Sequence, residues 1–323
     1  MTAGSRADGQ STAGPGADAH IARARAQVLA VRGGELEAPV VCAFFDEATF
    51  TASYVVYDRA AKVAAIIDSV LDFDQAAGRT HTESADKIIA FIEEHGLSVA
   101  YILETHVHAD HLSAAPYLKQ HLGGQIVIGA EIVTVQGVFG EIFNEGPHFA
   151  RDGSQFDKLV SDGDMLMLGA VPVMALHVPG HTPADVAYVI GDAVFTGDTL
   201  FMPDYGTARA DFPGGDARKL YRAIRRLMVL PDETRVFLCH DYKTPSRAHF
   251  AWETTMGDER TGNIHVHEGI GEDAFVAMRT KRDATLSMPK LILPSIQVNM
   301  RAGQLPDPED NGRRYLKIPL NRF

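Results

Sequence analysis

Hydrophobic and polar positions first alternate in two adjoining segments. Residues 49–58 (TFTASYVVYD) and 62–69 (KVAAIIDS) are rich in β-branched and aromatic residues, and only residues 59–61 separate them. Such segments predict β-strands, and the short interval between them predicts a turn. We therefore expect a pair of adjacent strands here, within an ordered structure that starts near Gln27.

The hydrophobic period changes at residues 84–96 (SADKIIAFIEEHG), where isoleucines and a phenylalanine form one apolar stripe. This spacing predicts a helix that Ser84 caps and Gly96 ends. Residues 97–105 (LSVAYILET) then predict a buried strand, and Ser113 is the expected cap of the following helix.

The rest of the chain is dominated by short apolar segments. A second helix-like stretch, Asp216–Leu230, interrupts them. Two strand-rich halves, each followed by helices, predict an α+β fold in which two sheets pack face to face with helices outside. Further strands are expected at residues 125–131, 171–179, 184–190, 192–198 and 234–240.

The domain organisation follows from composition. Residues 1–26 are rich in Gly, Ala and Ser and carry both signs of charge, which predicts a disordered tail. Residues 27–323 are expected to form a single catalytic domain, in which residues 245–323 are an appendage over the active site.

Charge and cysteine content exclude several classes of function. The formal net charge of -12 disfavours nucleic acid and anionic membranes as partners, and no apolar run approaches the ~20 residues that span a bilayer. The two cysteines, Cys42 and Cys239, are too few for a disulfide framework. The first residues contain no apolar segment of a secretory signal, so a cytoplasmic location is expected.

The strongest chemical signal is THVHADH, residues 105–111, which places three histidines and an aspartate directly after the strand at 97–105. In an extended chain, residues two apart point the same way, so His106 and His108 converge. As the backbone curls toward the next helix, Asp110 and His111 can turn back to the same point. Imidazole and carboxylate are ligands of divalent metals, and the cluster predicts a metal site.

Three later strand ends carry further candidate ligands. His181 lies in VPGHTPADV, Asp198 in VFTGDTLF and His240 in VFLCHDY. Loops that follow scaffold strands commonly deliver functional side chains to one edge of a fold. With the first cluster, these residues complete a set of five histidines and two aspartates.

The motifs THVHADH, PGHTP, FTGDTL and CHDY, in this order, resemble the metallo-β-lactamase superfamily. The resemblance covers roughly residues 40–310 and implies a four-layer αβ/βα sandwich with the metal at one edge of the two sheets. It also implies that Asp68, at the end of a strand, orients a ligand histidine.

Two chemistries are compatible with this resemblance. A dinuclear zinc hydrolase of the glyoxalase II type would use a metal-bound hydroxide against a thioester. Its two zinc sites would be His106, His108 and His181, and Asp110, His111 and His240, with Asp198 bridging.

The segments Arg209-Ala-Asp211-Phe212, CHDY and NMRAG (residues 299–303) resemble instead the persulfide dioxygenases, also called sulfur dioxygenases. This resemblance implies one Fe(II) per chain, held by His106, His181 and Asp198 as a two-histidine, one-carboxylate triad, with Zn as the alternative metal. The implied reaction oxidises glutathione persulfide with O2 and water to sulfite and glutathione. His108, Asp110, His111, His240 and Asp68 would surround the metal without holding it.

Substrate and partner expectations also follow from the resemblance. Arg209 and Arg301 are expected to bind the carboxylates of glutathione, and Tyr242 to donate a hydrogen bond near the substrate sulfur. Tyr242, Asp110 and His111 are the residues expected to take part in catalysis, and Asp211 is expected to hold a loop. A homodimer is also expected.

Overall fold

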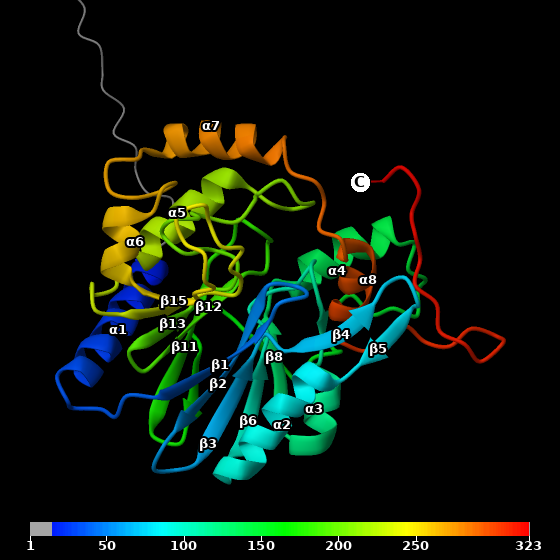
Figure 1. Cartoon of the computed structure of the whole chain (residues 1–323), viewed down its shortest axis with the longest axis horizontal. Helices are drawn as coiled ribbons and strands as arrows, with labels where there is room; N and C mark the ends of the chain where they lie inside the picture. Colours follow the sequence, from blue (N-terminus) through cyan, green and yellow to red (C-terminus); the bar gives the residue numbers. More distant parts are fainter. Residues whose placement is uncertain (1–14, 323) are drawn as a thin grey trace, which may run out of the picture.

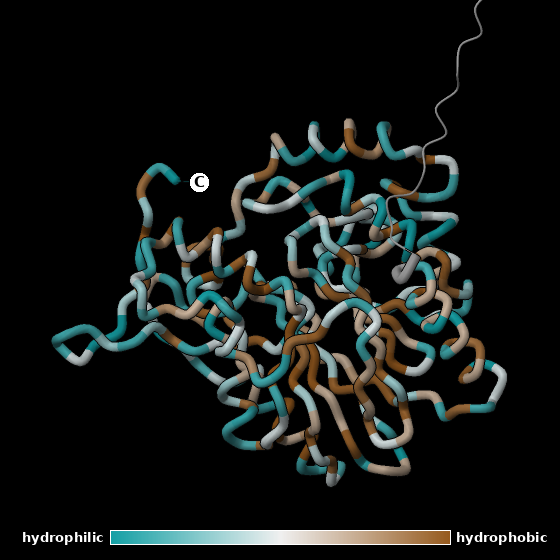
Figure 2. Tube along the Cα trace, turned by 180° about the vertical axis from the view of Figure 1, so that it is seen from behind, coloured by the Kyte–Doolittle hydropathy of each residue, from teal (hydrophilic) through white to brown (hydrophobic). Residues whose placement is uncertain are grey.

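The computed structural model describes residues 15–322. Within this range the chain forms two six-stranded sheets and one three-stranded sheet. Figure 1 shows the two large sheets side by side in the middle of the molecule, with helices on both outer sides. Figure 2 shows that hydrophobic residues are concentrated along these strands, whereas the outer loops are mainly hydrophilic.

The first large sheet has the order β1-β2-β3-β6-β8-β9, and it joins an antiparallel hairpin to parallel strands. The predicted turn at residues 59–61 connects its strands β2 and β3. The strands of this sheet are Val40–Asp46 (β1), Thr51–Asp58 (β2), Val63–Ile67 (β3), Ser98–Leu103 (β6), Gln125–Gly129 (β8) and Lys158–Val160 (β9).

The second large sheet has the order β10-β11-β12-β13-β14-β15 and is antiparallel except between β13 and β14. A small sheet, β5-β4-β7, lies beside the first. The second sheet contains Met165–Leu168 (β10), Val171–His177 (β11), Val186–Ile190 (β12), Ala193–Phe195 (β13), Arg235–Phe237 (β14) and Glu253–Thr255 (β15). The small sheet contains Val70–Asp74 (β4), Arg79–His81 (β5) and Leu112–Ser113 (β7).

Helices cover the outer face of each large sheet. Glu83–His95 (α2) and Ala115–Leu122 (α3) contact the first sheet, and Pro15–Arg32 (α1) contacts the second. The other helices are Ile132–Ile142 (α4), Ala217–Leu227 (α5), Met256–Gly262 (α6), Glu272–Asp283 (α7) and Ile292–Asn299 (α8).

The alternation along β2 shows how the layers are held together. Ala52, Tyr54 and Val56 belong to a core between the two sheets, which also contains Phe195 from the second sheet. Val55 belongs to a separate core between the first sheet and its helices. Because successive strand residues point to opposite faces, one strand contributes to both cores. A third core lies between the second sheet and its helices, so the four-layer αβ/βα prediction is confirmed.

The prediction of a tail at residues 1–26 is wrong for its last part. Helix α1 begins at Pro15 and buries Ile21, Ala24 and Val28 against the second sheet. Gln27, also in this helix, donates to the backbone oxygen of Val189. The apolar face of α1 is short and includes alanine, so the composition of this segment does not indicate a helix. Residues 1–14 lie outside the described residues.

Two smaller predictions also change. Thr82, rather than Ser84, occupies the cap position of α2, and the Ser84 hydroxyl donates to Asp72 at 2.7 Å. The region after residue 245 is not only an appendage, because its strand β15 pairs with β14 at the edge of the second sheet. Figure 1 shows α7 and α8, from the same region, above the sheet edges.

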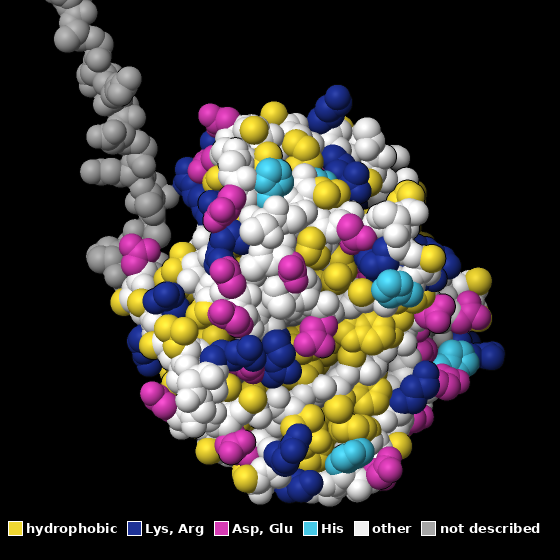
Figure 3. All heavy atoms as spheres, turned by 60° about the vertical axis from the view of Figure 1, so that its left-hand side comes forward, with side chains coloured by type: hydrophobic (Ala, Val, Ile, Leu, Met, Phe, Trp, Pro, Cys, Tyr) yellow, Lys and Arg dark blue, Asp and Glu magenta, His cyan; other side chains and the backbone are white. Residues whose placement is uncertain are grey.

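No helix among residues 15–322 has the length and apolar character needed to cross a membrane. On the face in Figure 3, acidic and basic side chains are interspersed with exposed hydrophobic groups. The expected cytoplasmic location and homodimer stay predictions.

The buried carboxyl group of Glu259, in α6, makes the fold sensitive to pH. Asn263 donates to its Oε2 at 2.7 Å, whereas its Oε1 has no hydrogen-bond partner among the described residues. Burial raises the pKa of Glu259 from 4.5 to about 8. Between these values the folded chain keeps a proton that the unfolded chain releases, so stability falls as pH rises, by at most about 1.4 kcal/mol per pH unit.

We therefore expect Glu259→Gln to unfold at a higher temperature than the unsubstituted protein, by an amount that grows from pH 5 to pH 8. Thermal unfolding followed by circular dichroism measures this difference. Glu233→Gln, which makes the same charge change at an exposed position, is the control and should show little pH dependence. A constant difference for Glu259→Gln across the range would contradict the assignment.

Candidate metal centre

The loop at residues 104–114, which follows β6, is fixed by the buried carboxylate of Asp68. Asp68 directly follows β3, and its backbone N–H donates to Leu103. The backbone N–H and the hydroxyl of Thr105 donate to the two carboxylate oxygens of Asp68, both at 2.8 Å. Because β3 and β6 are parallel neighbours, the sheet brings Asp68 and this loop together.

Asp68 also orients His108. Its Oδ1 lies 3.0 Å from His108 Nε2, and Glu104 Oε2 lies 3.3 Å from the same nitrogen. The opposite ring nitrogen, Nδ1, is buried and has no hydrogen-bond partner among the described residues. Asp68 thus leaves the His108 Nδ1 lone pair available, which is the arrangement expected of a metal-ligating histidine.

Asn299, at the end of α8, holds the same loop from the other side. Its amide nitrogen donates to the backbone oxygens of His108 at 2.9 Å and His111 at 2.8 Å, and its oxygen accepts from Ser113 N–H at 2.8 Å. Sequence reasoning noticed the NMRAG segment that begins with this residue but assigned Asn299 no role. The motif is visible in the sequence, but only the fold reveals the three hydrogen-bond partners of Asn299.

His181 and Asp198 reach the site from the second sheet. His181 follows β11, and its Nδ1 lies 2.8 Å from the backbone oxygen of Arg209, which directs Nε2 inward. Gly180, just before it, has φ +154° and approaches Leu220 so closely that a Cβ would lie 2.3 Å from the Leu220 Cα. This glycine therefore allows the His181 loop to pack against α5.

Three of the predicted ligands form a compact triad. The ligand atoms of His106, His181 and Asp198 all lie within 4.8 Å of one another. Asp198 Oδ2 is 3.9 Å from His106 Nε2 and 3.6 Å from His181 Nε2. All three side chains are buried, and His181 and Asp198 also line a pocket.

Three other predicted ligands, Asp110, His111 and His240, lie together beside the triad. Asp110 Oδ2 lies 3.1 Å from His111 Nδ1 and 3.4 Å from His240 Nε2. The hydroxyl of Thr51 lies 3.3 Å from the same carboxylate oxygen. His240 follows β14, and its Nδ1 lies 3.2 Å from the backbone oxygen of Phe50.

The buried polar atoms of this cluster match a metal site. Buried polar groups are normally hydrogen-bonded, and leaving one unpaired costs about 1–3 kcal/mol. Several ligand atoms nevertheless have no hydrogen-bond partner among the described residues, as is expected of side chains that bind metal ions. These atoms are His106 Nε2, His108 Nδ1, His111 Nε2, His240 Nε2 and Asp198 Oδ1.

The charges of the cluster depend on burial and on its carboxylates. Burial lowers the pKa of His106 and of His111, which favours the neutral imidazole that metal ions bind. Burial also lowers the pKa of His108, but the negative charge of Asp68 has the larger effect and raises this pKa well above its usual value. In the same way, the negative charge of Asp110 outweighs burial and raises the pKa of His240.

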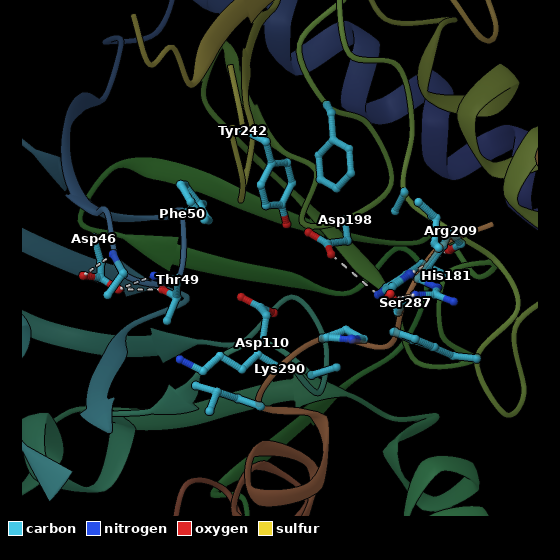
Figure 4. Close-up of a pocket in the computed structure, with 18 of the residues that line it drawn as sticks. Asp46, Thr49, Phe50, Asp110, His181, Asp198, Arg209, Tyr242, Ser287 and Lys290 are labelled. Atoms are coloured by element: carbon cyan, nitrogen blue, oxygen red, sulfur yellow. Dashed lines mark hydrogen bonds and ion pairs between the residues drawn. The ribbon is translucent and has the colours of Figure 1, made fainter. Parts of the chain in front are cut away.

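The pocket beside the triad has a volume of about 630 Å³, within the range of small-molecule sites. Figure 4 shows the Tyr242 hydroxyl pointing toward Asp198, with Asp110 nearby. Desolvation raises the pKa of Tyr242, so its hydroxyl remains a hydrogen-bond donor. The Tyr242 ring stacks on His240, with ring centroids 5.9 Å apart.

The two predicted substrate arginines differ in position. Arg209 lines the pocket, but its guanidinium is already paired with Asp211 at 2.6 Å and donates to the backbone oxygen of Ser287. Arg301 does not line the pocket and pairs with Glu145 at 2.6 Å. The structure thus places Arg301 outside the pocket lining and in an ion pair, and its expected role in substrate binding stays a prediction.

The sandwich and the histidine–aspartate cluster at its edge define a metal-dependent enzyme of the metallo-β-lactamase fold. A model of the metallo-beta-lactamase superfamily matches residues 47–240, and the chain belongs to this superfamily.

Its relatives carry two kinds of name. A probable metallo-hydrolase of Burkholderia pseudomallei is 59% identical to this chain; the match covers 86% of this chain and 98% of the relative. Glyoxylase B2 of Dictyostelium discoideum is 48% identical, and the match covers 84% of this chain and 93% of the relative. The human mitochondrial persulfide dioxygenase ETHE1 is more distant: it is 30% identical, and the match covers 89% of this chain and 97% of the relative.

Solved structures agree on the fold. The crystal structure of ETHE1 from Myxococcus xanthus superposes with a TM-score of 0.65 and 29% identity, covering 82% of this chain and all of that one. Persulfide dioxygenases are thus distant homologues of this chain.

We expect Asn299→Ala to weaken metal binding by about 10–100-fold, because two buried carbonyl groups of the ligand loop lose their donor. Competition with a chromophoric chelator measures the affinity. Asn263→Ala is the control, since Asn263 is an equally buried amide that donates to Gly206 and Glu259. Equal metal affinities for the two variants would show that Asn299 contributes only to stability.

Proposed function

We propose that this protein is an iron-dependent persulfide dioxygenase. The reaction converts glutathione persulfide, O2 and water into glutathione, sulfite and two protons. The observation that carries the proposal is the buried triad of His106, His181 and Asp198 beside an open pocket. A ferrous ion held by such a triad keeps coordination positions open for a sulfur ligand and O2.

In the proposed reaction, the other side chains position the substrate and carry protons. Tyr242 donates a hydrogen bond to the sulfur end of the substrate, since its hydroxyl faces the pocket beside Asp198. Asp110 lines the pocket and connects through Thr51 and His111 to the interior. In the proposed reaction, Asp110 and the neighbouring His111 accept a proton from the pocket.

Relatives and sequence segments add support. The human and Myxococcus ETHE1 proteins match most of this chain, including its C-terminal region. The Arg209-Ala-Asp211-Phe212 segment forms part of the pocket wall, and NMRAG contributes Asn299 to the ligand loop.

A dinuclear zinc hydrolase is the second candidate. It is favoured by the presence of all seven potential ligands and by the names of the more similar relatives, a probable metallo-hydrolase and Glyoxylase B2. In that case Asp110, His111 and His240 would hold the second ion, and the substrate would be a thioester.

The deciding experiment compares Fe(II)-loaded and Zn(II)-loaded protein, both prepared without O2. We expect rapid O2 uptake with glutathione persulfide for the iron form and none for the zinc form. His181→Ala should lose both the iron and the uptake. His111→Ala should keep one iron per chain and lose roughly 10–100-fold in rate, because it removes a neighbour of the site rather than a ligand.

Metal analysis and a second assay cover the alternative. Two zinc ions per chain, with cleavage of S-lactoylglutathione and no O2 uptake by the iron form, would overturn the dioxygenase proposal and establish the hydrolase.

A further inference from the structure

One peptide group connects a ligand of the metal centre to a buried carboxylate in α7. The backbone oxygen of Arg209 accepts from His181 Nδ1 at 2.8 Å, and Figure 4 shows the two residues side by side. The N–H of the same peptide group, that of Ala210, donates to Asp283 Oδ2 at 3.0 Å. Because the peptide bond is planar and trans, its C=O and N–H point in opposite directions. The peptide group thus lies between the Asp283 carboxylate and the His181 ring.

An ion pair within α7 holds this carboxylate in place. Arg279 donates from Nε to Asp283 Oδ1 at 2.8 Å, and its Nη2 lies 2.6 Å from the same oxygen, which leaves Oδ2 for Ala210. Its Nη1 donates to the backbone oxygen of Thr207 at 3.0 Å. Arg279 is 1% exposed and Asp283 is 4% exposed, and buried ion pairs contribute little net stability. What this pair does provide is fixed contacts to the backbone on both sides of Arg209.

The residues before Arg209 are held by α6 and the loop that follows it. The amide nitrogen of Asn263 donates to the backbone oxygen of Gly206 at 3.0 Å, and Thr207 N–H donates to His265 Nδ1 at 3.0 Å. Gly206 has φ +104°, and a side chain there would overlap the ring of His265. The C-terminal region therefore fixes the whole of residues 206–210.

The two histidines from the first sheet are also linked to a buried carboxylate. His108 Nε2 lies 3.0 Å from Asp68 Oδ1. The Nδ1 of His106 lies 3.0 Å from the hydroxyl oxygen of Thr105, whose proton is donated to Asp68. Asp68 is thus behind both rings, once directly and once through a hydroxyl. The ligand histidine of the second sheet has the peptide group and Asp283 in the corresponding places.

A carboxylate can act on a histidine through such a link. Hydrogen bonds in series polarise one another, so an acceptor with a negative charge at the N–H end makes the carbonyl at the other end a stronger acceptor. A histidine that donates one ring N–H to a strong acceptor is held in one tautomer and orientation, and its other nitrogen becomes a better metal ligand.

We propose that Asp283 is a positioning residue of the metal centre. Its carboxylate, held by Arg279, acts through the peptide group of Arg209 and Ala210 to fix the His181 ring and strengthen its bond to metal. Asp283 does not line the pocket, so this role involves no contact with a substrate. The proposal goes beyond the proposed reaction, since His181 is a ligand in both the one-iron and the two-zinc centre.

Metal affinity, measured by competition with a chromophoric chelator, gives the first test. Asp283→Asn removes the charge and should weaken metal binding about tenfold, the lower end of the range for groups that contact a ligand histidine directly. Asp192→Asn is the matched control. Asp192 is a buried carboxylate that pairs with Arg235 at 2.7 Å, just before β13, whereas Asp198 follows that strand. The control should bind metal as tightly as the unsubstituted protein.

A double variant separates positioning from stability. Arg279→Met combined with Asp283→Leu removes the ion pair without leaving a buried charge unpaired, a replacement that is often neutral for stability. We expect its unfolding temperature to be close to that of the unsubstituted protein. Its metal affinity should nevertheless fall about as far as that of Asp283→Asn.

Proton NMR of the Co(II)-loaded protein observes the His181 ring itself, because the paramagnetic ion shifts the N–H signals of ligand histidines away from the other signals. The signal of His181 is identified by its absence in His181→Ala. In Asp283→Asn this signal should move and exchange faster with water, while the other histidine signals stay in place. Asp192→Asn should change none of them.

The results can also contradict the proposal. Equal metal affinities for Asp283→Asn and Asp192→Asn, or equal changes at every histidine signal, would show that the α7 ion pair serves only stability. The outcome is separate from that of the proposed reaction. An iron form that consumes no O2 would reject the dioxygenase, but weaker metal binding by Asp283→Asn would still establish the role of Asp283.

Discussion

The buried carboxylate of Asp68 is the constraint on which the metal centre depends. An ionised carboxylate inside a protein is unfavourable unless hydrogen bonds compensate it. Thr105 supplies two of these bonds, and the ring of His108 lies 3.0 Å away. The charge of Asp68 and the conformation of the ligand loop therefore stabilise each other. Since the pairing of β3 with β6 fixes both, the core of the first sheet positions the ligand loop.

The C-terminal region links this metal loop to the pocket. Asn299, in α8, donates to the backbone of the loop, and several residues just before α8 form part of the pocket wall: Leu286, Ser287, Pro289, Lys290 and Leu291. The same region adds β15 to the second sheet, so it is anchored to both halves of the sandwich. A displacement of α8 would consequently affect both the ligand loop and the pocket wall. The metal loop and the pocket are thus parts of one arrangement.

Much of this site could be predicted because its ligands follow apolar strands and are few in type. His181, Asp198 and His240 each stand next to a strand that the sequence identifies, and the sheets gather them at one edge. Partners distant in the sequence could not be predicted. The ion pair of Arg301 with Glu145 is such a case, because the two residues are far apart in the chain and only the fold brings them together. The pairing of Arg209 with Asp211, only two residues apart, was open to sequence reasoning and would have revealed that its charge is already compensated.

Related enzymes with this ligand set can differ in chemistry through a single carboxylate. In this structure Asp110 Oδ2 lies close to His111 Nδ1, His240 Nε2 and the Thr51 hydroxyl. A hydrolase with two ions would use this carboxylate as a ligand, whereas an oxygenase with one iron would use it beside the metal. The fold permits both outcomes, because fold alone does not determine reaction. The residues around the shared triad, Asp110 among them, are therefore where the two proposed chemistries differ.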